Sequence, residues 1–444
     1  MEGAHGDGLL TDRPDPAENF TRVLGLTHVT ASGVGVIIGA GIYVLIGPAT
    51  QRAGAQVWMS MVLAAVLCAL TAFSYMELSA MFPRAGSEHE FARQVFPEWI
   101  SFATGWAMAV ALVVASAAVS LGFARYFQEF VHVDEHVASV GLILFVVLVS
   151  MVGMHTAKRL VVVLSAIQVV GLLVVVFAGI DHVGDVDLLH GNGLGGVLNG
   201  ASLVFFAYIG FDEVITLAEE THDPRRTVPR ALMLALAIST VLYVMVAVVA
   251  VSVLGPTELA RSTQPLTDVI RGSIGGGAVR TVAAVALATT ANTTLLATTA
   301  ASRMIYSMAN TGQLPQRLAR VHDGHSPRTS IAIVSAGAIV LSLVGGLDLL
   351  AEASNALVYV MFLVVNLVVI VLRFRRPDAE RPFMVSLHIG RFPVVPALGI
   401  AATLLMASRL ARAPVLVAFV LLAIGVAVHF TQERLRGTRA RPRT

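Results

Sequence analysis

Two glycine-containing stretches inside long apolar segments carry the groups that could bind a small molecule. The first runs from Gly33 to Tyr43 and reads GVGVIIGAGIY. Because glycine destabilises a helix, we predict that this helix unwinds at Gly39-Ala40-Gly41. Unpaired backbone groups at mid-membrane are tolerated only where they line a cavity, and free N–H groups at the start of a half-helix suit a carboxylate. Close helix packing through small residues is the alternative interpretation.

The second stretch, LVFFAYIGFDEV over residues 203–214, contains two adjacent acids within an apolar run. Acidic residues inside membrane segments are costly and usually functional. We expect Asp212 to cap a second half-helix by accepting its free N–H groups, which implies a break at Ile209-Gly210. Glu213 has no such role and is a candidate proton carrier.

The composition indicates a membrane protein. Hydrophobic residues make up 56% of the 444 residues and charged residues 13%, about half of the roughly 25% typical of soluble domains. This balance excludes a soluble enzyme, a disordered chain and a nucleic-acid binder. The single cysteine, Cys68, excludes an internal disulfide and a cysteine-based zinc site, and we expect neither a metal nor a cofactor.

Twelve apolar stretches are separated by breaks that contain charges, Pro and Gly. Since about 20 apolar residues span a bilayer core, we expect an all-α membrane protein with twelve transmembrane helices. The stretches are residues 26–47, 57–82, 99–124, 137–154, 160–180, 199–218, 230–254, 278–309, 330–346, 351–372, 393–408 and 413–431.

Basic residues in the predicted loops set the orientation. With the N-terminus inside, 22 Arg and Lys residues fall in inner loops and tails, and 7 fall in outer loops. Because basic residues accumulate on the cytoplasmic side, we expect both termini in the cytoplasm and an even number of spans. The first 24 residues are polar and typical of a tail rather than of a cleavable signal peptide.

The two predicted breaks, in spans one and six, lie five spans apart. Broken helices at matching positions in two halves indicate an inverted repeat with its binding site near the midplane. We therefore predict a five-plus-five inverted repeat followed by two further helices. The expected divisions are a tail at 1–24, the first repeat at 25–180, the second at 181–373, the last two spans at 374–431 and a tail at 432–444.

At these residues the chain resembles the amino acid–polyamine–organocation (APC) superfamily, and is similar to bacterial relatives of the cationic amino acid transporters. The similar segments occur in family order between residues 20 and 385. Each alone is a weak signal, and together they are specific. They are residues 38–43, 73–78, 82–87, 205–213, 219–230, 311–315 and 381–383.

The resemblance implies a secondary transporter that moves an amino acid across the cytoplasmic membrane by alternating access. N–H groups near the break in span one would hold the substrate carboxylate, and carbonyls beside both breaks would hold its ammonium. Donors from span one that face acceptors from span six suit a zwitterion. The backbone positions implied are Ile37, Gly39, Ala40, Gly41, Phe206, Ala207 and Ile209.

The resemblance also implies roles for side chains. Phe206 takes the place of an aromatic outer gate, although ordinary packing is the alternative. Thr104, Gly105 and Ala297 match positions of the side-chain pocket. The small residues there leave room for a medium or large side chain, and the absence of a matching carboxylate weakens a preference for a cationic one.

Ion coupling is where the chain departs from its proton-coupled relatives. These place a lysine in the middle of span five, where this chain has Gln168, which does not titrate. Glu213 could carry a proton instead, and the hydroxyls of Thr293 and Thr294 could coordinate sodium. Such hydroxyls more often bond to their own helix backbone, and uncoupled exchange is also open.

Other classes of function stay in view. An amino acid/polyamine exchanger would have the same fold. A membrane-embedded enzyme lacks its motifs, since no nucleophile elbow or zinc-protease pattern occurs, and we expect no enzyme. A channel would need a filter sequence or rings of charge, and neither is evident.

Overall fold

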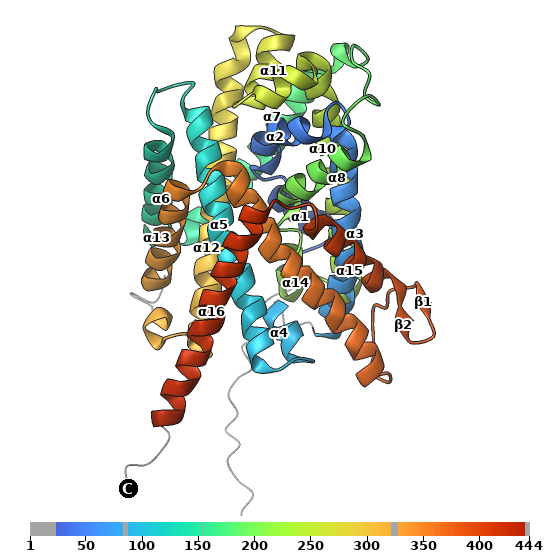
Figure 1. Ribbon diagram of the computed structural model, residues 1–444, viewed down its shortest axis with the longest axis vertical. Coiled ribbons are helices and arrows are strands. Elements are labelled where there is room, and N and C mark those ends of the chain that lie inside the picture. Colours follow the sequence, from blue (N-terminus) through green and yellow to red (C-terminus); the bar gives the residue numbers. More distant parts are fainter. Residues whose placement is uncertain (1–23, 83–87, 153, 321–326, 440–444) are drawn as a thin grey trace, which may run out of the picture.

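The computed structural model describes residues 24–439, except 83–87, 153 and 321–326, as a bundle of long helices (Figure 1). The predicted tail 1–24 lies almost wholly outside the described residues, and the described part of 432–444 continues a helix to Arg439. The strands of the described part form one small hairpin, β1 (His388–Ile389) with β2 (Phe392–Pro393).

The helices follow the predicted order of apolar stretches. The first half contains α1 (Leu26–Ile37), α2 (Gly41–Ala53), α3 (Val57–Met81), α4 (Glu88–Arg93), α5 (Glu98–Phe127), α6 (Glu135–Val152) and α7 (Met154–Gly179). The second contains α8 (Gly193–Val204), η3 (Phe205–Tyr208), α9 (Glu213–Thr216), η4 (Leu217–Glu220), α10 (Pro224–Arg261), α11 (Pro265–Ser273), α12 (Val279–Asn310), α13 (Arg328–Val344) and α14 (Leu347–Arg375). Two further helices, α15 (Val394–Ala407) and α16 (Arg412–Arg439), complete the chain.

The described residues include eight helices that are long and apolar enough to cross a membrane, or nine if α1 and α2 count as one bent span. Three shorter apolar helices, α6, α13 and α15, correspond to the other predicted spans. The all-α membrane fold is therefore confirmed, and the number of helices that cross the bilayer stays a prediction.

The predicted break in span one is confirmed. Helix α1 ends at Ile37, α2 begins at Gly41, and the two axes differ by 50°. The bend therefore falls on Ile38, Gly39 and Ala40, at the glycines that mark it in the sequence.

The break in span six is longer than predicted. Regular α-helix ends at Val204, a tight 3-10 turn follows, and α9 begins only at Glu213. Gly210 has a φ of +106°, which glycine adopts readily. Asp212 stands at the start of α9, but its carboxylate makes no capping hydrogen bond, so that predicted role is wrong. Because α9 has only four residues, it offers few N–H groups to cap.

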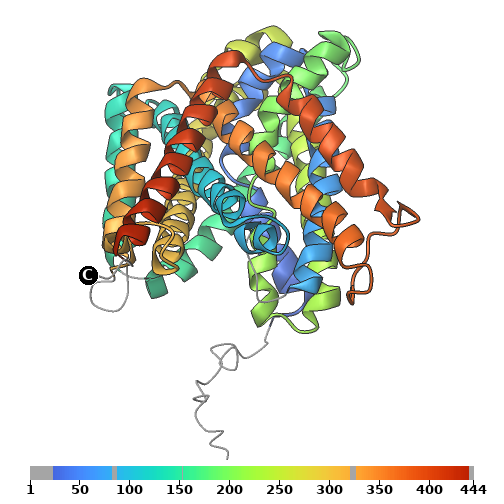
Figure 2. The same cartoon turned by 60° about the horizontal axis from the view of Figure 1, so that its bottom comes forward.

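Helix α5 forms the centre of the bundle. In its most apolar part, 89% of the residues are buried, compared with 22% in α16. Alanines such as Ala107, Ala111 and Ala115 are buried along α5, and small side chains let neighbouring helices approach closely in a membrane. Helices α12 and α14 pack on α5, whereas α16, coloured red, lies on the outside (Figure 2).

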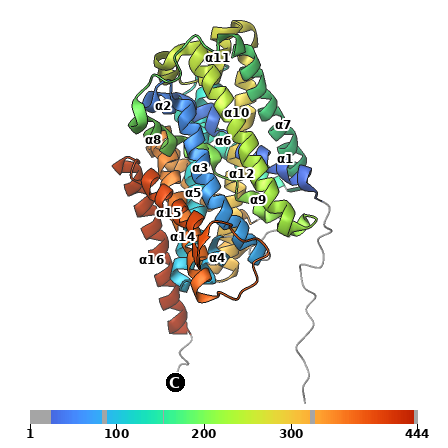
Figure 3. The same ribbon diagram turned by 90° about the vertical axis from the view of Figure 1, so that its right-hand side faces the viewer.

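Spans one and six run in opposite directions. Leu24, just before α1, forms a parallel bridge with Thr221, just after η4. The beginning of span one therefore lies beside the end of span six. Figure 3 shows α10 returning next to α3, with which it packs. This antiparallel relation of the two broken spans is what an inverted repeat requires.

A buried ion pair fixes the end of α3. Glu77 is 1% exposed and accepts hydrogen bonds from the Arg373 guanidinium, with Nε to Oε1 at 3.0 Å, and from the Val385 N–H at 3.0 Å. Arg381 lies 3.5 Å from the same carboxylate. A buried charge is tolerated when it is paired and hydrogen-bonded. Glu77 therefore joins α3 to α14 and to the segment that leads to the hairpin.

Candidate substrate site

The two helix breaks touch each other. A Cβ atom added to Gly41 would lie 2.5 Å from Cα of Ala207. The first turn of α2 can therefore approach the backbone of η3 only because residue 41 has no side chain. The main chains of the two predicted binding segments, on spans one and six, are therefore in direct contact.

A tyrosine that the sequence did not single out bridges the two breaks. The Tyr243 hydroxyl, from α10, lies 2.6 Å from the carbonyl oxygen of Ile37 and 2.9 Å from that of Ala207. These carbonyls stand where α1 ends and where η3 nears its end, so each has lost its regular helical partner. The Tyr243 hydroxyl donates its one hydrogen to these two carbonyl oxygens in a shared hydrogen bond.

The N–H groups at the break in span one also have partners. The Ala40 N–H donates to Thr293 Oγ1 at 3.1 Å, and the Gly39 N–H donates to the Ile37 carbonyl at 2.8 Å. The Thr293 hydroxyl in turn donates to the Thr289 carbonyl, and Thr294 donates to the carbonyl one turn earlier. Both threonines therefore bond to their own helix, while Thr293 also faces the predicted carboxylate position.

Gln168 fastens α7 to both parts of span one. Its side chain is fully buried, and Nε2 donates to the Gly35 carbonyl in α1 at 2.7 Å. Its main-chain carbonyl accepts a hydrogen bond from the Tyr43 hydroxyl of α2 at 2.8 Å. The Oε1 atom has no hydrogen-bond partner among the described residues. A neutral amide therefore makes these contacts at the position where we expect a titrating lysine in proton-coupled relatives.

The predicted side-chain pocket positions lie on α5 and α12. The Thr104 hydroxyl donates to the Ile100 carbonyl of its own helix, so its polar end is already bonded. A Cβ on Gly105 would lie 3.3 Å from Cβ of His89, which places α4 against this position. Ala297 and Phe206 are each buried, with 8% exposed.

The residue next to the predicted gate has a structural role. Phe205 packs on Tyr359 and Phe362, with ring centroids 4.6 and 5.3 Å apart. The Phe206 carbonyl, a predicted ammonium acceptor, accepts from the Ile209 N–H at 3.3 Å. The ring that faces α14 is therefore that of Phe205, which leaves the gating role of Phe206 a prediction.

Buried acids meet on the α4 side of the breaks. Both side chains are buried, and the Tyr75 hydroxyl donates to Glu88 Oε1 at 3.0 Å. Burial, and then the charge of the nearby Asp212 carboxylate, raise the pKa of Glu88. Glu88 therefore favours its neutral form more than an exposed glutamate does. Sequence reasoning missed Glu88, because only the fold places it beside Asp212.

Glu213 lies within electrostatic reach of two charged neighbours. One is Asp212, the residue before it, and the other is Arg303 in α12. The predicted proton carrier therefore interacts with span eight as well as with the neighbouring acid of span six.

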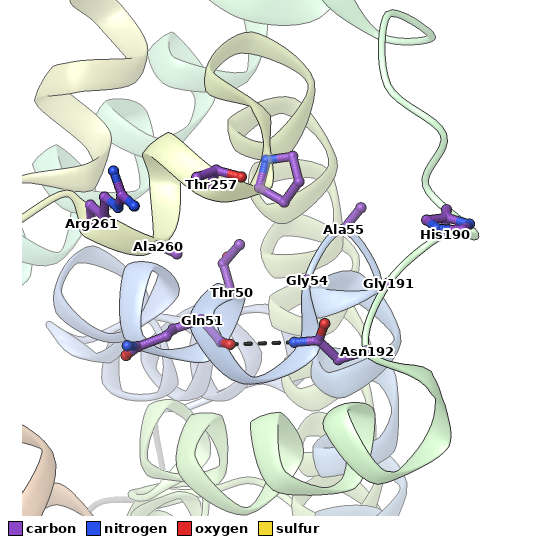
Figure 4. Close-up of a pocket in the computed structure, with 11 residues that line it drawn as sticks. Thr50, Gln51, Gly54, Ala55, His190, Gly191, Asn192, Thr257, Ala260 and Arg261 are labelled. Atoms are coloured by element: carbon purple, nitrogen blue, oxygen red, sulfur yellow. Dashed lines mark hydrogen bonds between the residues drawn. The ribbon is translucent and has the colours of Figure 1, made fainter.

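A cavity of about 440 Å³ opens at the other end of the bundle, near the end of α2 (Figure 4). Its lining comes from α2, the segment before α8 and the end of α10, and includes Thr50, His190, Asn192, Thr257 and Arg261. The Asn192 amide donates to the Gln51 and Arg52 carbonyls. Thr50 follows Gly41 by nine residues on α2, so about 14 Å of helix separates this cavity from the break.

The sequence matches known proteins over almost its whole length. A family model described as amino acid permease matches residues 24–435. The branched-chain amino acid permease of Bacillus subtilis is 30% identical over 443 residues, 94% of each chain. The methylthioribose transporter of the same organism is 29% identical over 94% of this chain and 95% of its own. The vacuolar cationic amino acid transporter 4 of Arabidopsis thaliana is 29% identical over 84% of this chain and 66% of its own.

The contact at Gly41 generates a first prediction. In a Gly41→Ala variant the added Cβ would push α2 away from Ala207, because main-chain atoms cannot turn aside. We expect the variant to insert and purify, and to lose thermal stabilisation by every member of a panel of the twenty amino acids. Gly141→Ala in α6 is the control, since nothing lies within 4 Å of its Cβ position. An undiminished thermal shift in Gly41→Ala would show that the close contact is not needed for binding.

The hydrogen bonds of the Tyr243 hydroxyl to both breaks generate a second prediction. Tyr243→Phe removes the hydroxyl that donates to the Ala207 and Ile37 carbonyls, of which Ile37 keeps only its bond from the Gly39 N–H, and we expect a loss of about 1–3 kcal/mol in stability. Hydrogen exchange at the amides near Gly39 and Ile209 should rise. Tyr359→Phe is the matched control, because it loses only a 3.3 Å bond to a Ser202 carbonyl that Asn355 also serves. Equal effects in both variants would contradict a specific role for Tyr243.

Proposed function

This chain belongs to the amino acid permease family, and on that premise we propose that it carries an amino acid with a neutral, apolar side chain across the cytoplasmic membrane by alternating access. The observation that supports this most directly is the contact between the two helix breaks, which places N–H donors beside carbonyl acceptors. A zwitterion needs both kinds of group. The substrate would pass through unchanged, so no catalytic step is involved.

The proposed binding mode uses the backbone on both sides of the contact. The substrate carboxylate would take the N–H groups of Gly39, Ala40 and Gly41, at the start of a half-helix. The ammonium would take the carbonyls of Ile37, Phe206 and Ile209, beside Ala207. Thr293 and Tyr243 hold some of these groups now, and would release them as the substrate enters.

The substrate class follows from the pocket positions. Thr104, Gly105 and Ala297 supply no charge, and the Thr104 hydroxyl is bonded within its helix. A neutral side chain therefore fits them better than a charged one. The similarity to a protein named as a branched-chain amino acid permease agrees with this choice. Phe206 would close the pocket toward the outer side.

A cationic amino acid or a polyamine is the second candidate, and one observation favours it. Glu88 and Asp212 place two buried carboxyl groups next to α4, and His89 of α4 lies against Gly105. A long cationic side chain could extend from the pocket toward them. In that case the protein would act as an exchanger of amino acids or amines.

We also propose the orientation and the domain division. The excess of 22 inner over 7 outer basic residues supports cytoplasmic termini in the inner membrane. Residues 25–180 and 181–373 would form the two repeats, and 374–431 the two additional spans. The antiparallel course of spans one and six supports this division.

Uptake by the purified protein in liposomes tests the function. We expect saturable uptake of radiolabelled leucine, with competition by isoleucine and valine at least tenfold stronger than by lysine or putrescine. Preferred uptake of lysine or putrescine would support the second candidate. Flux that rises linearly with concentration and shows no exchange would contradict a transporter and indicate a channel.

Gln168 generates a prediction about coupling. Without a titrating group at this position, we expect a pH gradient to change leucine uptake by the wild type less than about twofold. A buried lysine can lose its proton near neutral pH, so Gln168→Lys should make uptake clearly pH-dependent. Gln168→Met, whose side chain has a similar length and no titrating group, should not.

Other coupling groups have their own signatures in the same assay. Strong proton-driven accumulation in the wild type that is lost in Glu213→Gln would assign coupling to span six. Accumulation that survives Glu213→Gln and requires Na⁺ would assign it to Thr293 and Thr294. Either result would contradict an uncoupled carrier.

A further inference from the structure

A second cavity lies among the start of α5, the turn after α12 and the last turns of α16; Figure 1 shows the lower part of α16 and α4 at the same end of the bundle. The cavity measures about 220 Å³. The lining residues are Glu98, Gln313, His429, Gln432 and Glu433. Glu98 precedes Gly105 by seven residues on α5, about 10 Å along the helix, and His89 lies between Gln313 and Gly105, so the cavity neighbours the proposed substrate site without sharing its lining residues.

Two of the lining side chains are buried and lack a partner. Gln313 is 6% exposed and His429 is 3% exposed. Gln313 Oε1 and His429 Nε2 have no hydrogen-bond partner among the described residues. The His429 ring stacks on Phe102 with centroids 4.6 Å apart, which fixes its position. A buried polar atom without a partner costs about 1–3 kcal/mol, so this cavity favours a ligand that bonds to both.

The hydrogen bonds of His89 determine what Gln313 offers. His89 Nδ1 lies 2.8 Å from the Ser101 carbonyl oxygen, which can only accept, so Nδ1 carries the hydrogen. In the neutral ring Nε2 is then an acceptor, and the Gln313 Nε2 amide, 3.1 Å away, donates to it. The remaining atom of that amide, Oε1, is an acceptor that needs a donor.

The charges of the lining have one sign. Glu98 and Glu433 contribute carboxylates, and none of the described residues that line the cavity is Lys or Arg. Together with Gln313 Oε1, these carboxylates surround the cavity with hydrogen-bond acceptors and give it a negative charge. The complementary ligand is a compact cation with several N–H donors, which describes an ammonium group.

We propose that this cavity binds the primary ammonium group of a small organic cation. The group could belong to a free amine or to an ethanolamine lipid headgroup, because both present the same N–H donors. The ammonium would donate to Gln313 Oε1, to Nε2 of a neutral His429 ring that carries its hydrogen on Nδ1, and to a carboxylate of Glu98 or Glu433. The site recognises no α-carboxylate, which distinguishes it from the proposed substrate site.

Isothermal titration of the full-length protein with ethanolamine, in detergent free of aminolipids, tests the site. We expect saturable binding, and at least tenfold weaker binding of choline, whose quaternary nitrogen has no N–H donor. His429→Phe keeps the stacking on Phe102 and removes the ring nitrogen, and Glu433→Gln removes an exposed charge. Each should weaken ethanolamine binding about tenfold.

Two controls separate this site from others. Glu380→Gln changes an exposed acid that pairs with Arg225 outside the cavity, and should bind ethanolamine like the wild type. Gly41→Ala should also bind it normally while losing amino acid binding, so failure of one site is distinguishable from failure of the other. Absence of saturable binding, equal binding of choline, or unchanged binding by both His429→Phe and Glu433→Gln would overturn the proposal.

The source of the ammonium is resolved in nanodiscs. If phosphatidylethanolamine nanodiscs prevent ethanolamine binding and phosphatidylcholine nanodiscs do not, the headgroup is the occupant. If binding is the same in both lipids, the site takes a free amine. Both results support an ammonium site, and each assigns its ligand to a different source.

Discussion

The structure depends on how two broken helices satisfy their backbone groups inside a membrane. No water is available there to replace a lost helical hydrogen bond, and each unsatisfied group costs several kcal/mol. The Tyr243 hydroxyl meets this requirement for the Ile37 and Ala207 carbonyls together. It can reach both only because Gly41 lets the two breaks touch. Gly41 of span one and Tyr243 of span seven therefore act together: the glycine allows the contact with span six, and the tyrosine hydroxyl bonds to the carbonyls on both sides of it.

The neighbouring helices extend the same principle. Helix α7 holds α1 through Gln168 and Gly35, and holds α2 through Tyr43 and the Gln168 carbonyl. Helix α12 supplies Thr293 to the Ala40 N–H. Both halves of span one are thus bonded to the same residue of α7, and α12 bonds to the bend between them. The geometry of the break is therefore set by side chains from two other helices as well as by its own glycines.

The sequence predicted what local chemistry controls. The apolar stretches matched the helices, and Gly39 and Gly41 marked the break in span one, because glycine acts on its own backbone. It did not predict what distant residues control. Tyr243 lies 206 residues from Ile37 in sequence, and Glu88 meets Asp212 only after the fold forms. The expected cap at Asp212 failed because the helix that follows it, α9, has only four residues, and the length of a helix inside a broken span is set by its packing rather than by the local sequence.

The hydrogen bonds that Thr293 and Tyr243 make to the breaks have a consequence for selectivity. In the proposed binding mode, a substrate carboxylate at Ala40 would replace the Thr293 hydroxyl, and an ammonium at Ile37 would replace that of Tyr243. A hydrogen bond to a charged group contributes about 1.5–3 kcal/mol, compared with about 0.5–1.5 for a neutral one, so each exchange gains on the order of 1 kcal/mol. A ligand with only one of the two charges would replace one of these hydrogen bonds, and would lack the binding free energy that the other replacement contributes. Because the protein already bonds these backbone groups, only a zwitterion would make both gains, and the proposed site would discriminate against ligands with a single charge through its backbone groups.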